Sequence, residues 1–178
     1  MAALGANAPL IWAIPLSNID GIEQGDYGKD NFPYDLNRAW GVPPMRHETL
    51  VLQRDMRRWA ARCRPMLTLD FHAPGGTEAD GTYVFVVPAQ QAPELHARQI
   101  AFAKMWADHL TDTLVARNSV RQADYPSRWE TPTLTRGAWQ ALGVPGVSFE
   151  TPYALRQNGT VLYTREEYRH TGACTADA

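Results

Sequence analysis

The chain has 178 residues and a mass of 19.9 kDa, which is enough for one domain with its own hydrophobic core. Its formal net charge is −2 and its pI is about 6.2, so neither nucleic acid nor an anionic membrane surface is favoured as a partner. The two cysteines, Cys63 and Cys174, are too few for a disulfide framework or a cysteine-rich zinc site.

The sequence carries no sign of a membrane span or a secretory leader. No apolar run approaches the length that crosses a bilayer. The first residues lack the positive start and continuous apolar segment of a signal peptide, so we expect a cytoplasmic location. The oligomeric state stays open.

The first half of the chain alternates apolar segments with one long polar loop. The run 10–16 predicts a buried strand. Residues 17–44 predict a loop dense in Gly, Asp, Asn and Pro, and loops of that length in compact domains usually have a function. Helical spacing of apolar residues predicts an amphipathic helix over 47–63 and the next apolar run predicts a strand over 66–71.

The second half continues this alternation and ends in a small, polar tail. Its predicted elements are a central strand at 82–87, a long helix at 93–117, a loop at 118–131, a short helix at 132–142 and a core strand at 147–150. Asn158-Gly159 favours a hairpin turn over a glycosylation site. Residues 1–170 therefore predict a single α/β domain, with a mixed, mostly parallel sheet flanked by helices, and 171–178 a disordered tail.

His72 closes a predicted strand, and ligands of α/β proteins bind beside such strand ends. Its imidazole is either a metal ligand or, as for most isolated histidines, an ordinary core or surface group. Asp70 points to the same face two residues earlier. We favour a structural role for Asp70 over that of an outer partner of a metal-binding His72.

Glu150 ends the other buried-strand pattern, where a carboxylate is costly unless it is paired or functional. A catalytic role therefore competes with a plain salt bridge or a turn cap. Asn37 and Arg38 precede Trp40 and offer an amide and a planar guanidinium, which together can grip a carboxylate. Arg38 can instead stack on Trp40 or pair with Asp35.

Four segments in this order resemble the zinc carboxypeptidases, the carboxypeptidase A-like metallopeptidases. They are Asn18-Ile19-Asp20-Gly21, Asp35-Leu36-Asn37-Arg38-Ala39-Trp40, the strand that ends in His72, and the strand that ends in Glu150. The resemblance runs from about Leu10 to Tyr153 and rests on their order, since no single motif is decisive.

The resemblance implies a function in which each of these residues has a part. His72 would be one of three protein ligands of a catalytic zinc. Glu150 would be the general base that takes a proton from water and delivers it to the leaving amine. Asn37 and Arg38 would hold the free carboxylate of a peptide or an N-acyl amino acid.

Two features depart from the family pattern. The family takes its other two zinc ligands from a His-x-x-Glu segment before the Asn-x-Asp-Gly loop, and no His or Glu stands there in this sequence. We therefore expect an incomplete, C-terminal portion of the domain that binds zinc weakly or not at all. The Arg that the family uses to polarise the scissile carbonyl is also missing, and Lys29 is the only cation near that position. Lys29 has three interpretations that stay open: it substitutes in part for that Arg, it indicates a different substrate, or it is a solvated loop residue.

Three functions remain open at this point. The first is a zinc-dependent metallocarboxypeptidase domain, incomplete in this chain. The second is a deacylase or amidohydrolase that acts on an N-acyl amino acid with the same scaffold. The third is an inactive remnant that only binds carboxylate-ended peptides.

Overall fold

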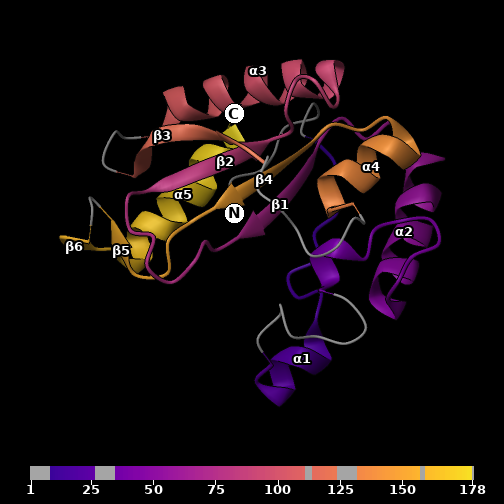
Figure 1. Cartoon of the computed structure of the whole chain (residues 1–178), viewed down its shortest axis with the longest axis horizontal. Coiled ribbons are helices and arrows are strands. Elements are labelled where there is room, and N and C mark those ends of the chain that lie inside the picture. The colour runs from indigo at the N-terminus through magenta and orange to yellow at the C-terminus, as the bar shows by residue number, and fades with distance from the viewer. Residues whose placement is uncertain (1–8, 27–34, 111–113, 124–131, 157–158, 178) are drawn as a thin grey trace.

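The structure is a computed structural model that describes residues 9–26, 35–110, 114–123, 132–156 and 159–177 (Figure 1). The helices are α1 (Ile19–Gln24), the 3₁₀ turn η2 (Leu36–Arg38), α2 (His47–Ala60), α3 (Pro93–His109), α4 (Leu134–Leu142) and α5 (Arg165–Asp177). The strands are β1 (Thr68–His72), β2 (Thr82–Val86), β3 (Val115–Gln122), β4 (Gly146–Glu150), β5 (Leu155–Arg156) and β6 (Val161–Leu162).

A four-stranded sheet in the order β1-β4-β2-β3 forms the centre of the fold. β1 and β4 run parallel, as do β2 and β3, whereas β2 and β4 run antiparallel. Helices lie on both sides of this sheet in Figure 1, with α3 and α5 away from α2 and α4. The predicted α/β class with a mixed, mainly parallel sheet is therefore confirmed.

One face of the sheet is apolar and carries the main core. Alternation along β4 turns Val147 and Phe149 to this face, where the rings of Phe102 and Trp106 on α3 meet Phe149 edge-on. α5 packs against α3, and Trp106 Nε1 donates a hydrogen bond to Thr175 Oγ1 at 3.1 Å. This core fixes the position of β4 and of the residues at its end.

The opposite face of β4 receives α4. A Cβ added to Gly146 would lie 2.8 Å from Cα and Cβ of Thr135, so the strand and the helix approach closely at this glycine. A Cβ at Gly137 would lie 3.0 Å from Cβ and the carbonyl oxygen of Trp40. α4 therefore connects the sheet to the segment that follows η2.

Most of the predicted strands and helices are confirmed, but three segments differ. Residues 10–16 form no strand in the structure, and their apolar side chains are exposed, with Leu10 at 67%. The predicted helix 93–117 ends at His109, and β3 occupies part of the predicted loop 118–131. The reason is that β3 lies at the sheet edge, where its mixed polar sequence gives no apolar periodicity.

The predicted disordered tail at 171–178 is wrong for most of its length, because α5 continues to Asp177. Thr171, Cys174 and Thr175 are buried, since their small side chains let α5 lie close to α3. The predicted hairpin is seen as the antiparallel pair β5 and β6, with Gly159 at a φ of +83°, while Asn158 lies outside the described residues.

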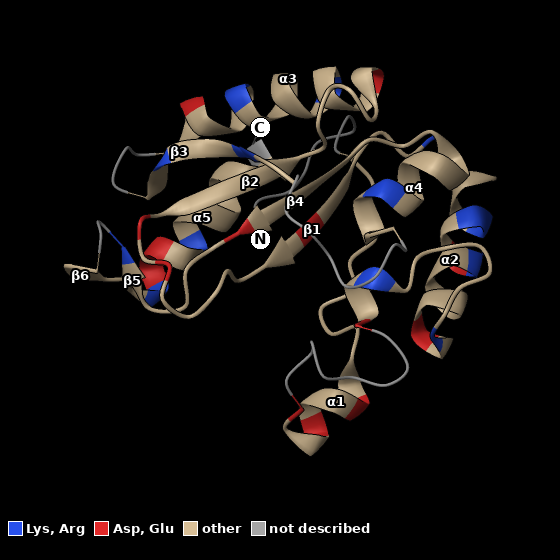
Figure 2. Cartoon of the chain, viewed as in Figure 1, with Lys and Arg blue, Asp and Glu red and all other residues tan. Residues whose placement is uncertain are grey.

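Charges of both signs are distributed over the helices. Figure 2 shows Lys and Arg mixed with Asp and Glu on α2, α3 and α5, whereas α1 carries acidic residues only. None of the helices in the described ranges combines the length and the apolarity that a membrane crossing needs.

Candidate functional site

The parallel pair β1 and β4 places His72 next to Glu150. The two residues are register partners at the carboxyl ends of their strands, and Thr151 N donates to His72 O at 3.0 Å just beyond. Side chains alternate along a strand, so His72 and Glu150 lie on the face opposite the stacked rings of Phe71 and Phe149.

Asp70 and Ser148 belong to the same face, two positions earlier in the register. Asp70 Oδ2 lies 3.0 Å from His72 Nε2, and Ser148 Oγ donates to the same carboxylate oxygen at 3.4 Å. Asp70 therefore fixes the imidazole of His72 from the side of β1, which is the arrangement of a carboxylate that orients a functional histidine.

Asn37 reaches His72 from η2. Asp35 caps this turn, because its Oδ1 accepts the Asn37 backbone N–H at 2.9 Å. Asn37 Nδ2 lies 2.8 Å from His72 Nε2, and Asn37 Oδ1 accepts the backbone N–H of Leu134 at 3.1 Å. The amide of Asn37 thus joins η2, the start of α4 and the end of β1.

Arg38 is adjacent to this contact and is buried, with 8% of its surface exposed. Its Nη1 donates to Asn37 O at 3.0 Å. α2 and α4 hold the segment beyond it, because Gln53 Nε2 donates to Trp40 O at 3.0 Å and Gly137 packs on Trp40. The structure therefore brings Asn37, Arg38, His72 and Glu150 to one end of the sheet, whereas Lys29 lies outside the described residues.

A second cluster beside Glu150 was not predicted from the sequence. Tyr83 on β2 is the antiparallel register partner of Glu150, and its hydroxyl donates to Glu78 Oε2 at 3.0 Å. Arg121 Nη1 bonds the same oxygen at 2.7 Å, and its guanidinium lies 3.5 Å from the centroid of the Tyr83 ring. In the sequence Tyr83 has only the pattern of a core strand residue, so no signal pointed to this cluster.

This environment keeps Tyr83 neutral. Burial is the largest cause that raises the pKa of its phenol, and the carboxylates of Glu150 and Glu78 raise it further, while Arg121 opposes them. Glu150 therefore has a neutral phenol, not a phenolate, on its β2 side.

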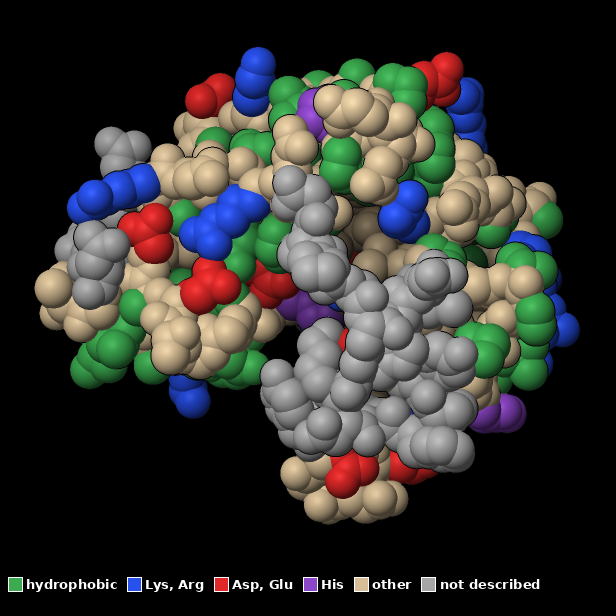
Figure 3. Space-filling view, viewed as in Figure 1, with side chains coloured by type: hydrophobic (Ala, Val, Ile, Leu, Met, Phe, Trp, Pro, Cys, Tyr) green, Lys and Arg blue, Asp and Glu red, His purple; other side chains and the backbone are tan. Residues whose placement is uncertain are grey.

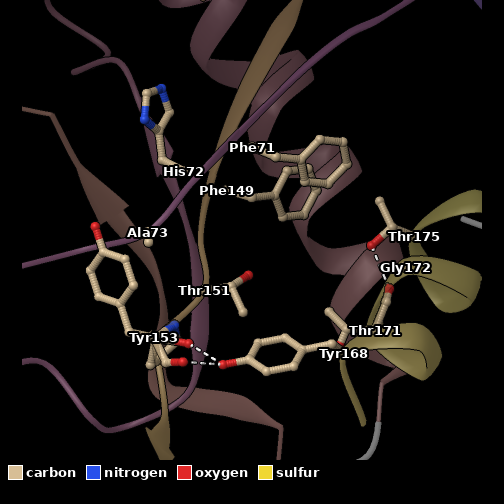
Figure 4. A pocket seen from close by; sticks show the side chains of 11 residues that line it. Phe71, His72, Ala73, Phe149, Thr151, Tyr153, Tyr168, Thr171, Gly172 and Thr175 are labelled. Atoms are coloured by element: carbon tan, nitrogen blue, oxygen red, sulfur yellow. Dashed lines mark hydrogen bonds between the residues drawn. The ribbon is translucent and has the colours of Figure 1, made fainter. Parts of the chain in front are cut away.

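The ends of β1 and β4 border a cavity of about 380 Å³ that reaches α5 (Figure 4). His72 and Tyr153 lie at its rim, Phe71 and Phe149 form part of its wall, and Tyr168 and Thr171 of α5 line the far side. In Figure 3 a histidine and acidic side chains gather near the middle of the view, where the surface is hollowed. The cavity thus lies on the Phe71 and Phe149 side of the strand ends, and His72 stands at its edge.

The described residues do not make up a zinc site by themselves. Within the ranges given above, no group of three or more His, Cys, Asp or Glu side chains is placed to hold a metal ion. Catalytic zinc needs three protein ligands, and His72 is the one that the sequence pattern predicts.

Comparison with known proteins gives a result at the level of structure only. No protein-family model and no curated protein matches the sequence. A metallo-carboxypeptidase from Burkholderia cenocepacia is similar over 80% of this chain and 36% of its own, with a TM-score of 0.52 and 16% identity. A proposed carboxypeptidase from Burkholderia mallei matches over the same shares, with a TM-score of 0.50 and 15% identity.

A succinylglutamate desuccinylase from Chromobacterium violaceum is also similar, over 90% of this chain and 48% of its own, with a TM-score of 0.47 and 18% identity. The chain thus spans between about a third and a half of the length of these structures. Together with the sheet order and the strand ends that carry His72 and Glu150, the two carboxypeptidase matches show that this chain has a zinc-carboxypeptidase-like fold.

Proposed function

We propose that this chain forms the carboxylate-binding and general-base part of a carboxypeptidase-like hydrolase. Its substrate is a peptide or an N-acyl amino acid with a free C-terminal carboxylate. Asn37 and Arg38 bind that carboxylate, and Glu150 acts on the amide bond next to it. The chain supplies His72 as one ligand of a metal site.

The observation that carries this proposal is the contact between η2 and the strand ends. The amide of Asn37 lies 2.8 Å from His72, and His72 is the register partner of Glu150. A carboxylate held by Asn37 and Arg38 would therefore lie at the same end of the sheet as Glu150. Fixing one end of a substrate in this way brings the same amide bond to the reacting group each time.

Glu150 supplies the proton transfer that amide hydrolysis needs. As a general base it accepts a proton from the attacking water, and it then returns that proton to the leaving nitrogen. Peptides and N-acyl amino acids both have the required carboxylate and amide, so the same geometry serves a carboxypeptidase and a deacylase.

Binding of a carboxylate can be tested without catalysis. We expect this chain to bind an N-acetylated dipeptide with a free carboxylate at least tenfold more tightly than the same dipeptide with a C-terminal amide. Arg38→Gln removes this difference, because the neutral side chain loses the charge-assisted contact. Arg38→Lys restores only part of it, because an ammonium lacks the planar fork. Isothermal titration or NMR titration measures both constants.

Arg54→Gln is the matched control for these variants. Arg54 is an exposed cation on α2 that pairs with Asp55, so its replacement leaves the preference for the acid unchanged. Equal binding of the acid and the amide by the unaltered chain would contradict the proposed carboxylate site. Tight one-to-one zinc binding would show in addition that metal ligands beyond His72 had been missed.

A further inference from the structure

We propose that Tyr153 contacts the acyl part of the substrate, on the side of the scissile amide away from Asn37 and Arg38. This inference rests on the proposed function. It adds a second recognition element, which selects the group attached to the amide carbonyl, while Arg38 selects the carboxylate.

Tyr153 stands close to Glu150 in the chain. It follows Glu150 by three residues, and Thr151 between them is bonded through its backbone N–H to the carbonyl of His72 at 3.0 Å. The path from Glu150 to Tyr153 is therefore tied to the end of β1. Tyr153 borders the cavity of about 380 Å³ together with His72, and it also borders a second cavity of about 530 Å³.

The backbone of Tyr153 is held in place, whereas its side chain is exposed. Tyr168 on α5 places its hydroxyl 2.7 Å from the carbonyl oxygens of both Pro152 and Tyr153. Tyr168 itself stacks on Tyr163, with ring centroids 4.8 Å apart. Yet the Tyr153 side chain is 66% exposed and makes no hydrogen bond or ring contact within the described residues.

A large aromatic side chain that is exposed beside a cavity, on a backbone held at two carbonyls, is available for a ligand. Figure 4 shows the phenol of Tyr153 extending toward Ala73, on the side of the strand ends where His72 lies, and away from α5. Its ring offers an apolar surface and its hydroxyl a hydrogen-bond donor and acceptor.

Tyr153 also lies in the direction in which a bound substrate would extend. Figure 1 shows α1, α2 and α4 on one side of the ends of β1 and β4, and β5 on the other. Asn37 belongs to the side of α4, because its Oδ1 accepts the backbone N–H of Leu134. Tyr153 lies two residues before the start of β5. A substrate with its carboxylate at Arg38 and its amide at Glu150 therefore extends its acyl group toward Tyr153. An acyl group with a flat or apolar body suits this ring best.

Two ligands with the same carboxylate and amide but different acyl groups test the inference. They are N-acetylglycine and N-benzoylglycine, with dissociation constants measured by NMR or isothermal titration. We expect the unaltered chain to prefer the benzoyl compound by roughly three- to tenfold, the range that an aromatic contact supports. Tyr153→Ala brings the ratio close to one, and Tyr153→Phe retains most of it.

Three further variants separate this contact from general effects. Leu162→Ala removes an apolar side chain of similar exposure, 65%, from β6 and leaves the ratio unchanged. Tyr168→Phe releases the two carbonyls and lowers the ratio in part, as expected for a positioning residue. Arg38→Gln weakens both ligands equally and leaves the ratio as it was.

The outcomes distinguish the two proposals. If both ligands bind in an Arg38-dependent way but the unaltered chain and Tyr153→Ala have the same ratio, the role of Tyr153 is wrong and the carboxylate site stands. If the unaltered chain binds neither ligand, the carboxylate site and the role of Tyr153 are both overturned.

Discussion

At the scale of single residues, Nε2 of His72 has two neighbours with opposite requirements. Asp70 Oδ2 at 3.0 Å only accepts a hydrogen bond, so Nε2 must carry a hydrogen to bind it. Asn37 Nδ2 at 2.8 Å only donates, so Nε2 must present a lone pair. The two residues therefore compete for one ring nitrogen, and a ligand that draws Asn37 away favours the bond with Asp70.

Removal of Asp70 should change the tautomer of His72. In Asp70→Ala the remaining neighbour of Nε2 is the amide of Asn37, so we expect the fraction of molecules with hydrogen on Nε2 to fall. Imidazole ¹⁵N chemical shifts at about pH 8, where an ordinary histidine is neutral, measure this fraction. Ser148→Ala, which removes only the 3.4 Å contact on the far side of Asp70, is the control. An unchanged tautomer in Asp70→Ala would mean that Asn37 already determines it.

At the scale of elements, the close approach of α4 to β4 determines how the residues of the site are positioned. α4 donates through Leu134 N to Asn37 and packs through Gly137 on Trp40, so its position sets that of η2. β4 in turn carries Glu150. The glycine at 146 is therefore as much a part of the site geometry as the residues that touch a substrate.

Gly146→Ala should destabilise the fold and weaken the site together. The new Cβ would meet Cα and Cβ of Thr135 at 2.8 Å, and such overpacking typically costs about 1–3 kcal/mol. Urea unfolding measures this loss, and the preference for a free carboxylate should fall with it. Gly172→Ala is the matched control, because no atom lies within 4 Å of the added Cβ and α5 gains a better helix former. Equal stability of the two variants would contradict the tight α4–β4 contact.

The elements that the sequence predicted are those with strong periodicity or clear end signals. β2 and β4 have continuous apolar runs, and α4 ends at Gly143, whose φ of +66° is easy for glycine only. β3 and α5 were missed for the opposite reason. β3 lies at the sheet edge and lacks an apolar pattern. α5 buries small polar residues, whose sequence alone is typical of a disordered tail, because it packs against α3.

The site shows the same division. The ends of β1 and β4 follow from strand patterns, so His72 and Glu150 were expected near one sheet edge. The contact between Asn37 and His72 joins residues 35 positions apart, and the cluster of Tyr83, Glu78 and Arg121 joins three separate segments. Local sequence patterns do not predict such long-range contacts, because these depend on how the elements pack.

At the scale of the whole molecule, the sheet separates an apolar core from a polar face. Phe149 and Trp106 are buried on one side with α3 and α5. On the other side Tyr83 is also buried, with 2% of its surface exposed, but it lies beside two carboxylates. The fold therefore contains a neutral phenol whose ionisation the surroundings oppose.

This arrangement predicts a loss of stability at alkaline pH that depends on Tyr83. The folded state raises the pKa of this phenol above its ordinary value of 10, so between the two values the unfolded chain binds fewer protons than the folded one. The stabilising contribution is fully present below about pH 10 and decreases as the pH rises further.

Tyr83→Phe should cost about 1 kcal/mol near pH 7, through the lost hydrogen bond to Glu78, yet lose less stability above about pH 10 than the unaltered chain. Urea unfolding at a series of pH values from about 7 to 11 measures both curves. Parallel curves would mean that the phenol ionises as readily in the folded chain as in the unfolded one, which its burial between Glu78 and Glu150 opposes.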